Sequence, residues 1–462
     1  MAYPTHLSLW WIFIGRFRKK SAIMPFLQKR VQLNGGKSLI HCVTHHYEAN
    51  DKNDPRYLGH NSSKCDWVDD YDPLKHCKAP IPTATEKRKT KVKGKIGNIH
   101  VESVMVDGKP MFLCSKKDEK SVFMQDYVVH DGITYVPVQN LQPYDNYSFT
   151  AEEIEKLNSE PSSKESLLEN IEEQTNRYII ASTISKDLTT IDIFMSYCME
   201  QVDTVHFPFY VGETESGKSS CAHLFKNLAY RCLYSLDMTT PNVYQFLGQD
   251  EEGQGVIVED EAQEIYKNSE KIRLYKGSYS RGSKIVRIVN SDSQNRAQMT
   301  YFSFGIKVFA GEKLPQDKGL LERLAVVKMV EGIPNGNIKR LTVQEKQTLE
   351  QIRKKCLFWK MQHCWENLPE ISSELKNRDR ELWEDFLRIA NGTKFFDRAL
   401  QVVKFYTEQR HESIKNSLEA KLLRIIMNHL DENLEINIQE IWNYIISPEN
   451  HILTGKLEDR KS

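Results

Sequence analysis

The stretch HFPFYVGETESGKSSCAHLF, residues 206–225, decides the fold. An apolar run ends at Val211, a glycine-containing turn follows, and a helical pattern begins at Lys218. The turn satisfies the spacing G-x-x-x-x-G-K-[ST], with Gly212 and Gly217 as its two glycines. A strand, this turn and a helix, in that order, are the context in which the spacing cradles phosphate groups. The sequence therefore predicts a phosphate-binding loop.

Each residue type in the turn has a physical task. The glycines let the backbone curl so that its N–H groups converge on phosphate oxygens, and the helix start adds the positive end of its dipole. We expect Lys218 to reach the β- and γ-phosphates of bound ATP and the Ser219 hydroxyl to bind Mg²⁺. The predicted nucleotide-binding residues are Gly212, Glu213, Thr214, Glu215, Ser216, Gly217, Lys218, Ser219 and Ser220.

Hydrolysis also requires acidic groups at the end of a neighbouring strand. The segment GVIVEDEAQEI (255–265) supplies them at the point where ligands of open α/β sheets bind. We expect Asp260 to hold Mg²⁺ through water, beside Ser219, and Glu261 to polarise the attacking water. If the register is shifted by one residue, Glu259 and Asp260 take these two roles instead.

Apolar runs alternate with helical stretches from about residue 191 onward. Continuous apolar strands of this kind belong to a parallel sheet covered by helices on both faces. The predicted fold class is therefore α/β, with a P-loop NTPase core built on a parallel sheet. The runs are HFPFYV (206–211), LYSLDM (233–238), GVIVED (255–260), FGIKVFA (304–310) and LAVVKMV (324–330).

The flanking regions have other patterns. Alternating segments interrupted by Asp-Gly at 107–108 and 131–132 predict hairpins, and hence a small antiparallel β module before the core. The C-terminal helices either pack on the core or open a partial winged helix. The predicted segments are a basic, His/Cys-rich N-terminal region (1–95), the β module (96–150), an acidic helical linker or solvated helix face (151–185), the ATPase core (186–335), a helical subdomain (336–410) and C-terminal helices (411–462).

Composition narrows the class of protein. Lys+Arg and Asp+Glu both number 63 among 462 residues, which excludes a chain-wide basic field for holding nucleic acid. Nine cysteines are too few for a disulfide scaffold of this size, so we expect a reducing, cytoplasmic setting. The apolar run 7–14 is too short to span a bilayer and precedes its basic residues, unlike a signal peptide. We read it as a buried strand or a leader ahead of Met24, with membrane association as a minor alternative.

The N-terminal region contains residue types that bind Zn²⁺, including a Cys-x-x-His pattern. Their spacing matches no standard zinc finger, so ordinary buried or surface histidines are preferred to a zinc site. The set is His41, Cys42, His45, His46, His60, Cys65, His76 and Cys77.

With these motifs in place, residues 191–408 resemble an AAA+-type P-loop ATPase of the kind found in primase–helicase-like proteins of archaea, phages and plasmids. The order and spacing of three further segments, together with Asp260–Ala262, carry the resemblance. The segments are GSYSRGSKIVRI (277–288), KVFAGEKLPQDKGLLERLAVVKM (307–329) and NRDRELWEDFLRIA (377–390).

The resemblance implies a role for Arg323 as an arginine finger or a cis sensor, because it precedes the last core strand. A surface ion pair with Glu322 is the competing interpretation. In AAA+ rings the finger reaches a neighbouring subunit's site, so the resemblance implies a homo-oligomer, commonly a hexamer. It also leads us to expect a polar Asn at the end of the preceding strand, where this sequence has Ala310, Gly311 and Glu312. The sensor residue therefore stays unassigned.

Residues 284–289 and 296–302 flank the polar tip NSDSQN (290–295), which is typical of a hairpin turn. In related helicases a hairpin at this place tracks single-stranded DNA. Candidates for phosphate contacts are Lys284, Arg287 and Arg296, although positive side chains on a hairpin are often simply solvated. The sequence thus favours an ATP-hydrolysing DNA motor, a replicative helicase-like translocase of an archaeal or mobile element. The alternative is a nucleotide-dependent regulatory or assembly switch that acts on a protein.

Overall fold

The computed structural model describes residues 87–415, except 118, 139–146, 249–254, 263–264, 266–267 and 290–296, and also Leu423, Ile426, Met427 and Gln439. The chain divides into two units, residues 1–87 and 88–462. Every helix and strand described below belongs to the second unit, except that Lys87, the first residue of β1, is assigned to the first. Several predictions lie outside the described residues: the apolar run 7–14, the zinc alternative of residues 41–77, Arg296 and the C-terminal helices after Lys415.

Eight strands form a small, mainly antiparallel β module, as the sequence predicts. One sheet has the order β2-β3-β4-β5, with β8 pairing parallel to β3, and the other has the order β1-β7-β6. The predicted Asp-Gly turns close the β3–β4 and β6–β7 hairpins, and their four residues have φ values from 48° to 77°, as the tight hairpin turns require. The strands are β1 Lys87–Lys91, β2 Lys93–Ile96, β3 Ile99–Val106, β4 Lys109–Lys116, β5 Glu119–Gln125, β6 Val128–His130, β7 Ile133–Pro137 and β8 Ser148–Phe149.

The module begins before residue 96, the boundary that the sequence suggests. The basic run 87–95 is not a separate tail, because it forms β1 and most of β2. Strand β1 lies at a sheet edge and is almost wholly exposed, so it needs no alternating apolar residues and gives no strand signal.

The core sheet is parallel, as predicted, and each of the five apolar runs coincides with one of its strands, although β14 extends one residue beyond its run. Among the described residues its order is β10-β11-β14-β9-β15, and every neighbouring pair is parallel. The three inner strands, β11, β14 and β9, are buried along nearly their whole length, which explains why they read as continuous apolar runs. They are β9 Phe207–Val211, β10 Leu233–Ser235, β11 Ile257–Asp260, β14 Lys307–Gly311 and β15 Leu324–Lys328.

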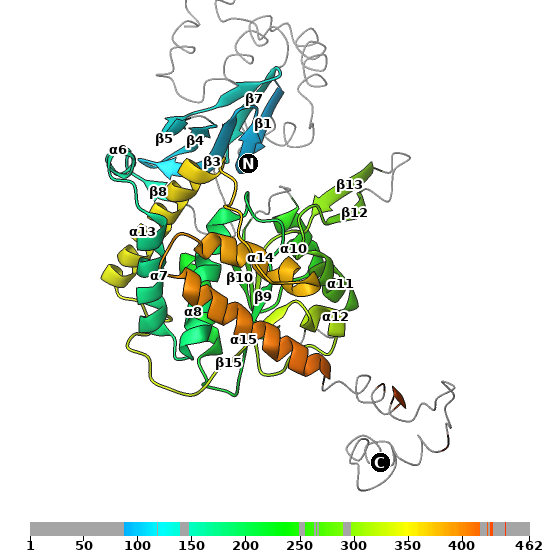
Figure 1. The fold of residues 1–462 in the computed structure, drawn as a ribbon. Coiled ribbons are helices and arrows are strands. Elements are labelled where there is room, and N and C mark those ends of the chain that lie inside the picture. The colour runs from blue at the N-terminus through cyan, green and yellow to red at the C-terminus, as the bar shows by residue number, and fades with distance from the viewer. Residues whose placement is uncertain are drawn as a thin grey trace, which may run out of the picture. The chain divides into compact units, whose positions relative to one another are not determined.

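Helices surround this sheet and account for most of the described residues between 342 and 415, as expected (Figure 1). The acidic segment 151–185 is helical too, but α7 buries Leu167, Leu168 and Ile171 in the main core and is not merely a solvated face. The helices are α6 Ala151–Ser159, α7 Lys164–Tyr178, α8 Thr183–Met195, the short η2 Ser196–Cys198, α9 Lys218–Leu228, α10 Thr240–Leu247, α11 Ser269–Gly277, α12 Lys318–Leu321, α13 Val343–His363, α14 Asn377–Ala390 and α15 Phe396–Lys415.

The two arms of the predicted hairpin are present between α11 and β14, and its predicted tip, residues 290–295, lies outside the described residues. Strands β12 (Lys284–Val289) and β13 (Ala297–Phe302) pair antiparallel and project from the side of the unit that carries α10 (Figure 1). At its base lies Lys307, the first residue of β14, which is fully buried. Its ammonium donates to the carbonyl oxygens of Ser303 (2.8 Å), Gly305 (2.7 Å) and Ser278 (3.3 Å), and burial lowers its pKa well below the usual value. One side chain thus ties the hairpin base to the central strand.

A buried group of charged residues joins the β module to the core; we name it the junction cluster. Glu102 on β3 accepts from Arg231 Nε at 2.5 Å and from the Tyr230 hydroxyl at 2.7 Å. Glu200 pairs with Lys360 at 2.7 Å and with Lys93 at 3.3 Å. These charged side chains are at most 1% exposed. The junction cluster consists of Lys93, His100, Glu102, Glu200, Tyr230, Arg231 and Lys360.

Two pKa shifts show that the junction cluster is held together by charge. Burial alone would raise the pKa of Glu200, but Lys360 and Lys93 outweigh it and lower that pKa well below the usual value. Burial would lower the pKa of Lys360, and Glu200 and Glu102 raise it instead. These groups are therefore charged in the folded protein and depend on one another, because a buried charge without its partner is costly.

No helix among the described residues has the length and apolar character needed to cross a membrane.

Candidate functional site

The turn after β9 has the backbone geometry that its two glycines suggest. Gly217 immediately precedes α9 and has a φ of 87°, a left-handed value that disfavours other residues. A Cβ on Gly212 would lie 2.6 Å from Ser216 Oγ and 3.0 Å from the carbonyl oxygen of Met329. Gly212 therefore has no room for a side chain, and Gly217 has a backbone conformation that disfavours one.

The start of α9 presents donors that the described part of the chain does not satisfy. No side chain caps this helix there, as is also the case for α10 and α14, whereas α6, α7, α8, α11 and α13 each have a capping side chain. The Ser216 hydroxyl is 5% exposed and finds no hydrogen-bond partner among the described residues. Helix N-termini bind anions through such free N–H groups. The turn therefore fits a phosphate group.

Lys218 folds back over this turn. Its ammonium donates to the carbonyl oxygens of Gly212 (2.8 Å) and Glu213 (2.6 Å). The ammonium therefore lies on the turn itself. There a bound phosphate would replace the two carbonyl oxygens as its hydrogen-bond partner and would be a charged one.

Asp260 lies beside Ser219, as the magnesium prediction requires. Strands β11, β14 and β9 are parallel, so their carboxyl ends meet at one edge of the sheet. Ser219 Oγ donates to Asp260 Oδ1 at 3.1 Å, and the Tyr234 hydroxyl donates to Asp260 Oδ2 at 2.9 Å. A hydroxyl and a carboxylate, with water and phosphate completing the shell, fit the few-ligand coordination that Mg²⁺ takes in nucleotide sites. We name residues 212–219, Tyr234, Asp260, Glu261 and Glu312 the loop edge.

Glu259 contacts other residues, so of the two carboxylates that the sequence offers beside Ser219, only Asp260 lies there. It is 2% exposed, pairs with Lys271 at 2.8 Å, and accepts from the Tyr275 hydroxyl. Burial raises its pKa, and Lys271 partly opposes that shift. Successive strand residues point to opposite faces, so Asp260, and not Glu259, contacts Ser219.

Glu261 follows β11 directly and is exposed. Its φ of 78° is left-handed, a conformation that costs about 1–3 kcal/mol for a residue with a side chain. Such strain is concentrated at functional positions in proteins. Glu261 therefore remains the candidate for polarising water.

Two residues of the loop edge are absent from the sequence prediction. Glu312 follows β14, between the other two strand ends, and accepts from Thr214 Oγ1 at 3.1 Å. It stands where the resemblance implies a polar sensor, and its place after an apolar strand could have identified it. Tyr234 on β10 had no such signal, because its partner is 26 residues away. Burial and the neighbouring Asp260 raise the pKa of Tyr234, so it stays a phenol donor.

Arg323 lies at the opposite edge of the sheet. It precedes β15, where Leu324 is paired with Phe207 and Lys328 with Val211, so the strand's length, ~13 Å, separates it from the turn. Its guanidinium packs on the Tyr279 ring at 4.6 Å and donates to the Gly319 carbonyl oxygen. This position does not support a cis role on its own subunit's loop; it leaves the role in a neighbouring subunit as a proposal.

The hairpin candidates differ in how well they could meet a phosphate backbone. Lys284 is exposed and lies 5.4 Å from the Phe302 ring. Arg287 forms an ion pair with Glu270 and packs on the Tyr244 ring, so its charge is already partly balanced. Arg296 lies outside the described residues.

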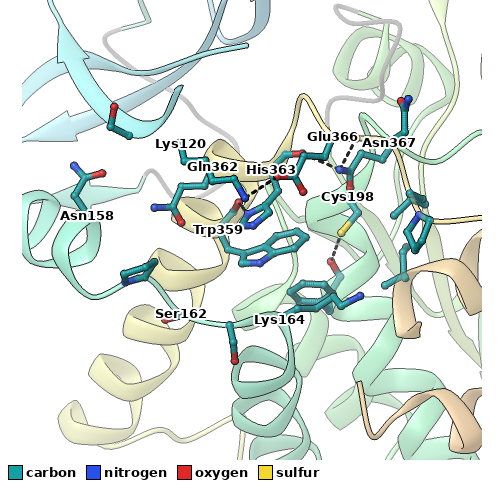
Figure 2. A pocket seen from close by; sticks show the side chains of 18 residues that line it. Lys120, Asn158, Ser162, Lys164, Cys198, Trp359, Gln362, His363, Glu366 and Asn367 are labelled. Carbon is teal, nitrogen blue, oxygen red and sulfur yellow. Dashed lines mark hydrogen bonds and ion pairs between the residues drawn. The ribbon is translucent and has the colours of Figure 1, made fainter. Parts of the chain in front are cut away.

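A cavity of about 670 Å³ lies away from the loop edge, between β5, the α6–α7 connection and the end of α13 (Figure 2). Trp359 and His363 stack beside it with ring centroids 4.3 Å apart, and Phe194 packs on Trp359. No residue predicted from the sequence as part of a site lines it. Among the described residues, no cluster of three or more His, Cys, Asp or Glu could hold a metal ion.

No protein-family model and no curated protein matches this chain. The solved structures that it matches include helicases. The apo NrS-1 C-terminal region is 11% identical over 77% of this chain and 84% of that one, with a TM-score of 0.27. An MCM homolog from Methanopyrus kandleri is 12% identical over 67% and 77%, with 0.36. The active helicase Cch of SCCmec type IV is 11% identical over 75% and 64%, with 0.35. Such TM-scores are too low to support a functional inference, so the function is inferred from this chain's own residues.

Proposed function

We propose that this protein binds ATP with Mg²⁺ and hydrolyses it, as a helicase-like motor acting on DNA. The observation that carries the proposal is the loop edge: a turn whose two glycines disfavour side chains, a buried Ser216 hydroxyl with no partner among the described residues, and Ser219 beside Asp260. Glycine-containing turns, hydroxyl groups and carboxylates at the carboxyl ends of parallel strands are the groups that phosphoryl-transfer enzymes use.

The roles follow from position. The N–H groups at the start of α9 and the Lys218 ammonium hold the terminal phosphates, while Ser219 and Asp260 hold the metal. Bound Mg²⁺ would neutralise charge developing on the phosphate oxygens. Glu261 takes the proton of the attacking water. Arg323, at the far edge of the sheet, would serve the site of a neighbouring subunit, which makes the working form a homo-oligomer, for example a hexamer.

DNA is proposed as the partner because the hairpin projects from the core and carries Lys284, Arg287 and Arg296 on or next to its arms. Val286 and Met299 are also strongly exposed there, at 56% and 46%. Basic and apolar groups together suit single-stranded nucleic acid, whose backbone is charged and whose bases stack. A protein-directed switch is the alternative, since exposed apolar side chains also suit a protein surface.

The test measures ATP hydrolysis with and without single-stranded DNA. We expect Lys218→Ala to abolish nucleotide binding or turnover, while Lys404→Ala, which removes an exposed lysine on α15, should change neither. Glu261→Gln should still bind ATP but hydrolyse it roughly 10²-fold more slowly. Normal turnover in Glu261→Gln would contradict the assignment of the water-activating residue.

The DNA arm of the test separates the two functions. A motor should be stimulated strongly by single-stranded DNA, and the stimulation should fall steeply as salt increases. Lys284→Ala should reduce the stimulation without changing the basal rate. A basal rate that DNA leaves unaltered, at low salt and in the oligomeric form, would favour the protein-directed switch.

A further inference from the structure

Asp260 has both carboxylate oxygens engaged by hydroxyl groups from different elements. Ser219 on α9 donates to Oδ1 at 3.1 Å, and Tyr234 on β10 donates to Oδ2 at 2.9 Å. Ser219 belongs to the predicted phosphate loop, whereas nothing in the sequence marks Tyr234. The two bonds fix which oxygen faces the loop.

The register of the sheet explains why this tyrosine reaches that carboxylate. Tyr234 is paired with Val258 on the adjacent strand, two residues before Asp260. Residues two apart on a strand share a face, so a side chain as long as tyrosine can span the diagonal to Asp260.

The tyrosine ring is itself held from α9. The His223 ring packs on it with centroids 5.0 Å apart, and Lys226 Nζ lies 5.3 Å from its centre. His223 and Lys226 come from the same helix as Ser219. The helix that begins at the phosphate loop therefore positions both hydroxyl groups that contact Asp260.

We propose that Tyr234 is a positioning residue for Mg²⁺: it anchors Asp260 Oδ2 so that Oδ1 is presented to the metal beside Ser219. The inference rests on the proposed function and adds to it a residue that acts through Asp260 without touching nucleotide. Substitution of groups that orient a metal-binding side chain in this way typically lowers metal affinity or activity by about 10- to 100-fold.

The test uses the full chain and a fluorescent ATP analogue, mant-ATP. Its Kd is measured in EDTA and then during a Mg²⁺ titration, which gives the Mg²⁺ concentration at half of the change in nucleotide affinity. For Tyr234→Phe we expect that midpoint to rise roughly tenfold, with the Kd in EDTA within about twofold of wild type. His223→Ala, which only loosens the ring, should shift the midpoint in the same direction by less.

Two controls bracket the result. Tyr135→Phe removes a hydroxyl from another half-buried tyrosine on a strand, on β7 of the β module, and should leave both values unchanged. Asp260→Asn should raise the midpoint at least as much as Tyr234→Phe.

The outcomes are distinguishable. A midpoint unchanged in Tyr234→Phe but raised in Asp260→Asn would overturn the inference and leave the proposed function standing. Equal losses in EDTA and in Mg²⁺ would also overturn it, because they would mean a general distortion of the loop. If the wild-type protein bound no mant-ATP, with or without Mg²⁺, the proposed function would fall and this inference with it.

Discussion

The short segment from Tyr230 to Tyr234 contacts two groups of charged side chains. The two groups contain the same kind of hydrogen bond but differ in what that bond does. At the junction cluster, Tyr230 and Arg231 bind Glu102. At the loop edge, Tyr234 binds Asp260. Both are tyrosine–carboxylate hydrogen bonds with a lysine close by, and a motif search would score them alike.

The difference lies in access to solvent. The charged side chains of the junction cluster are at most 1% exposed and paired with one another. At the loop edge Glu261 and Glu312 are exposed, Lys218 is satisfied only by carbonyls, and Ser216 has no partner among the described residues. A group of charges paired with one another and sealed from solvent specifies structure, whereas a group that solvent can reach is accessible to a ligand.

The largest expected effect concerns Arg323, which lies outside both groups, at the opposite edge of the core sheet from the loop edge. Arg323→Ala should lower ATP hydrolysis by roughly 10³-fold if Arg323 completes a neighbour's site. Mixing it with the equally inactive Lys218→Ala variant should restore part of the activity, because mixed oligomers contain some sites with both residues intact. Mixtures as inactive as their components would contradict a role in trans.

The second prediction breaks the junction cluster. Glu102→Gln leaves Arg231 buried without its carboxylate, so we expect the free energy of unfolding to fall by about 3–5 kcal/mol. Urea denaturation measures this loss. The matched control is Glu119→Gln, which removes an ion pair of the same module whose side chains are 40% and 48% exposed, and should cost less than about 1 kcal/mol. Similar losses from the two variants would mean that the junction cluster is not the stabilising contact.

The smallest effect sharpens the contrast between the two tyrosines. Tyr230→Phe removes one hydrogen bond to Glu102 and should lower the free energy of unfolding by about 1.5 kcal/mol, while the Mg²⁺ midpoint for nucleotide stays at the wild-type value. Tyr234→Phe should do the reverse. If both substitutions altered the same property, the two clusters would not have separate roles.

Features with a local signature were predictable from sequence. The apolar runs locate the strands of the parallel sheet, because strands buried on both faces need no polar alternation. The Asp-Gly pairs at 107–108 and 131–132 locate two hairpin turns, because only small or Asx residues adopt such φ values readily. The glycines of the turn before Lys218 mark one position that is too crowded for a side chain, Gly212, and one with a left-handed backbone, Gly217.

Features made by distant residues were not predictable. Arg231 meets Glu102 across 129 positions of the chain, and Glu259 differs from Asp260 only in the face of β11 on which it lies. The place of Arg323 depends on the parallel pairing of β15 with β9. The start of the β module was missed because an exposed edge strand carries no apolar pattern. To predict each of these features, one must know which strands pair and in which register, and a single sequence does not contain that information.

The three carbonyl oxygens gathered by Lys307 constrain how the hairpin can work. With Ser303, Gly305 and Ser278 bonded to the first residue of β14, a shift of the hairpin base along the core would leave a buried amino group without its partners. The base of the hairpin is therefore held in register with β14. Glu312 follows the other end of the same strand, so one short strand connects the hairpin base directly to the loop edge.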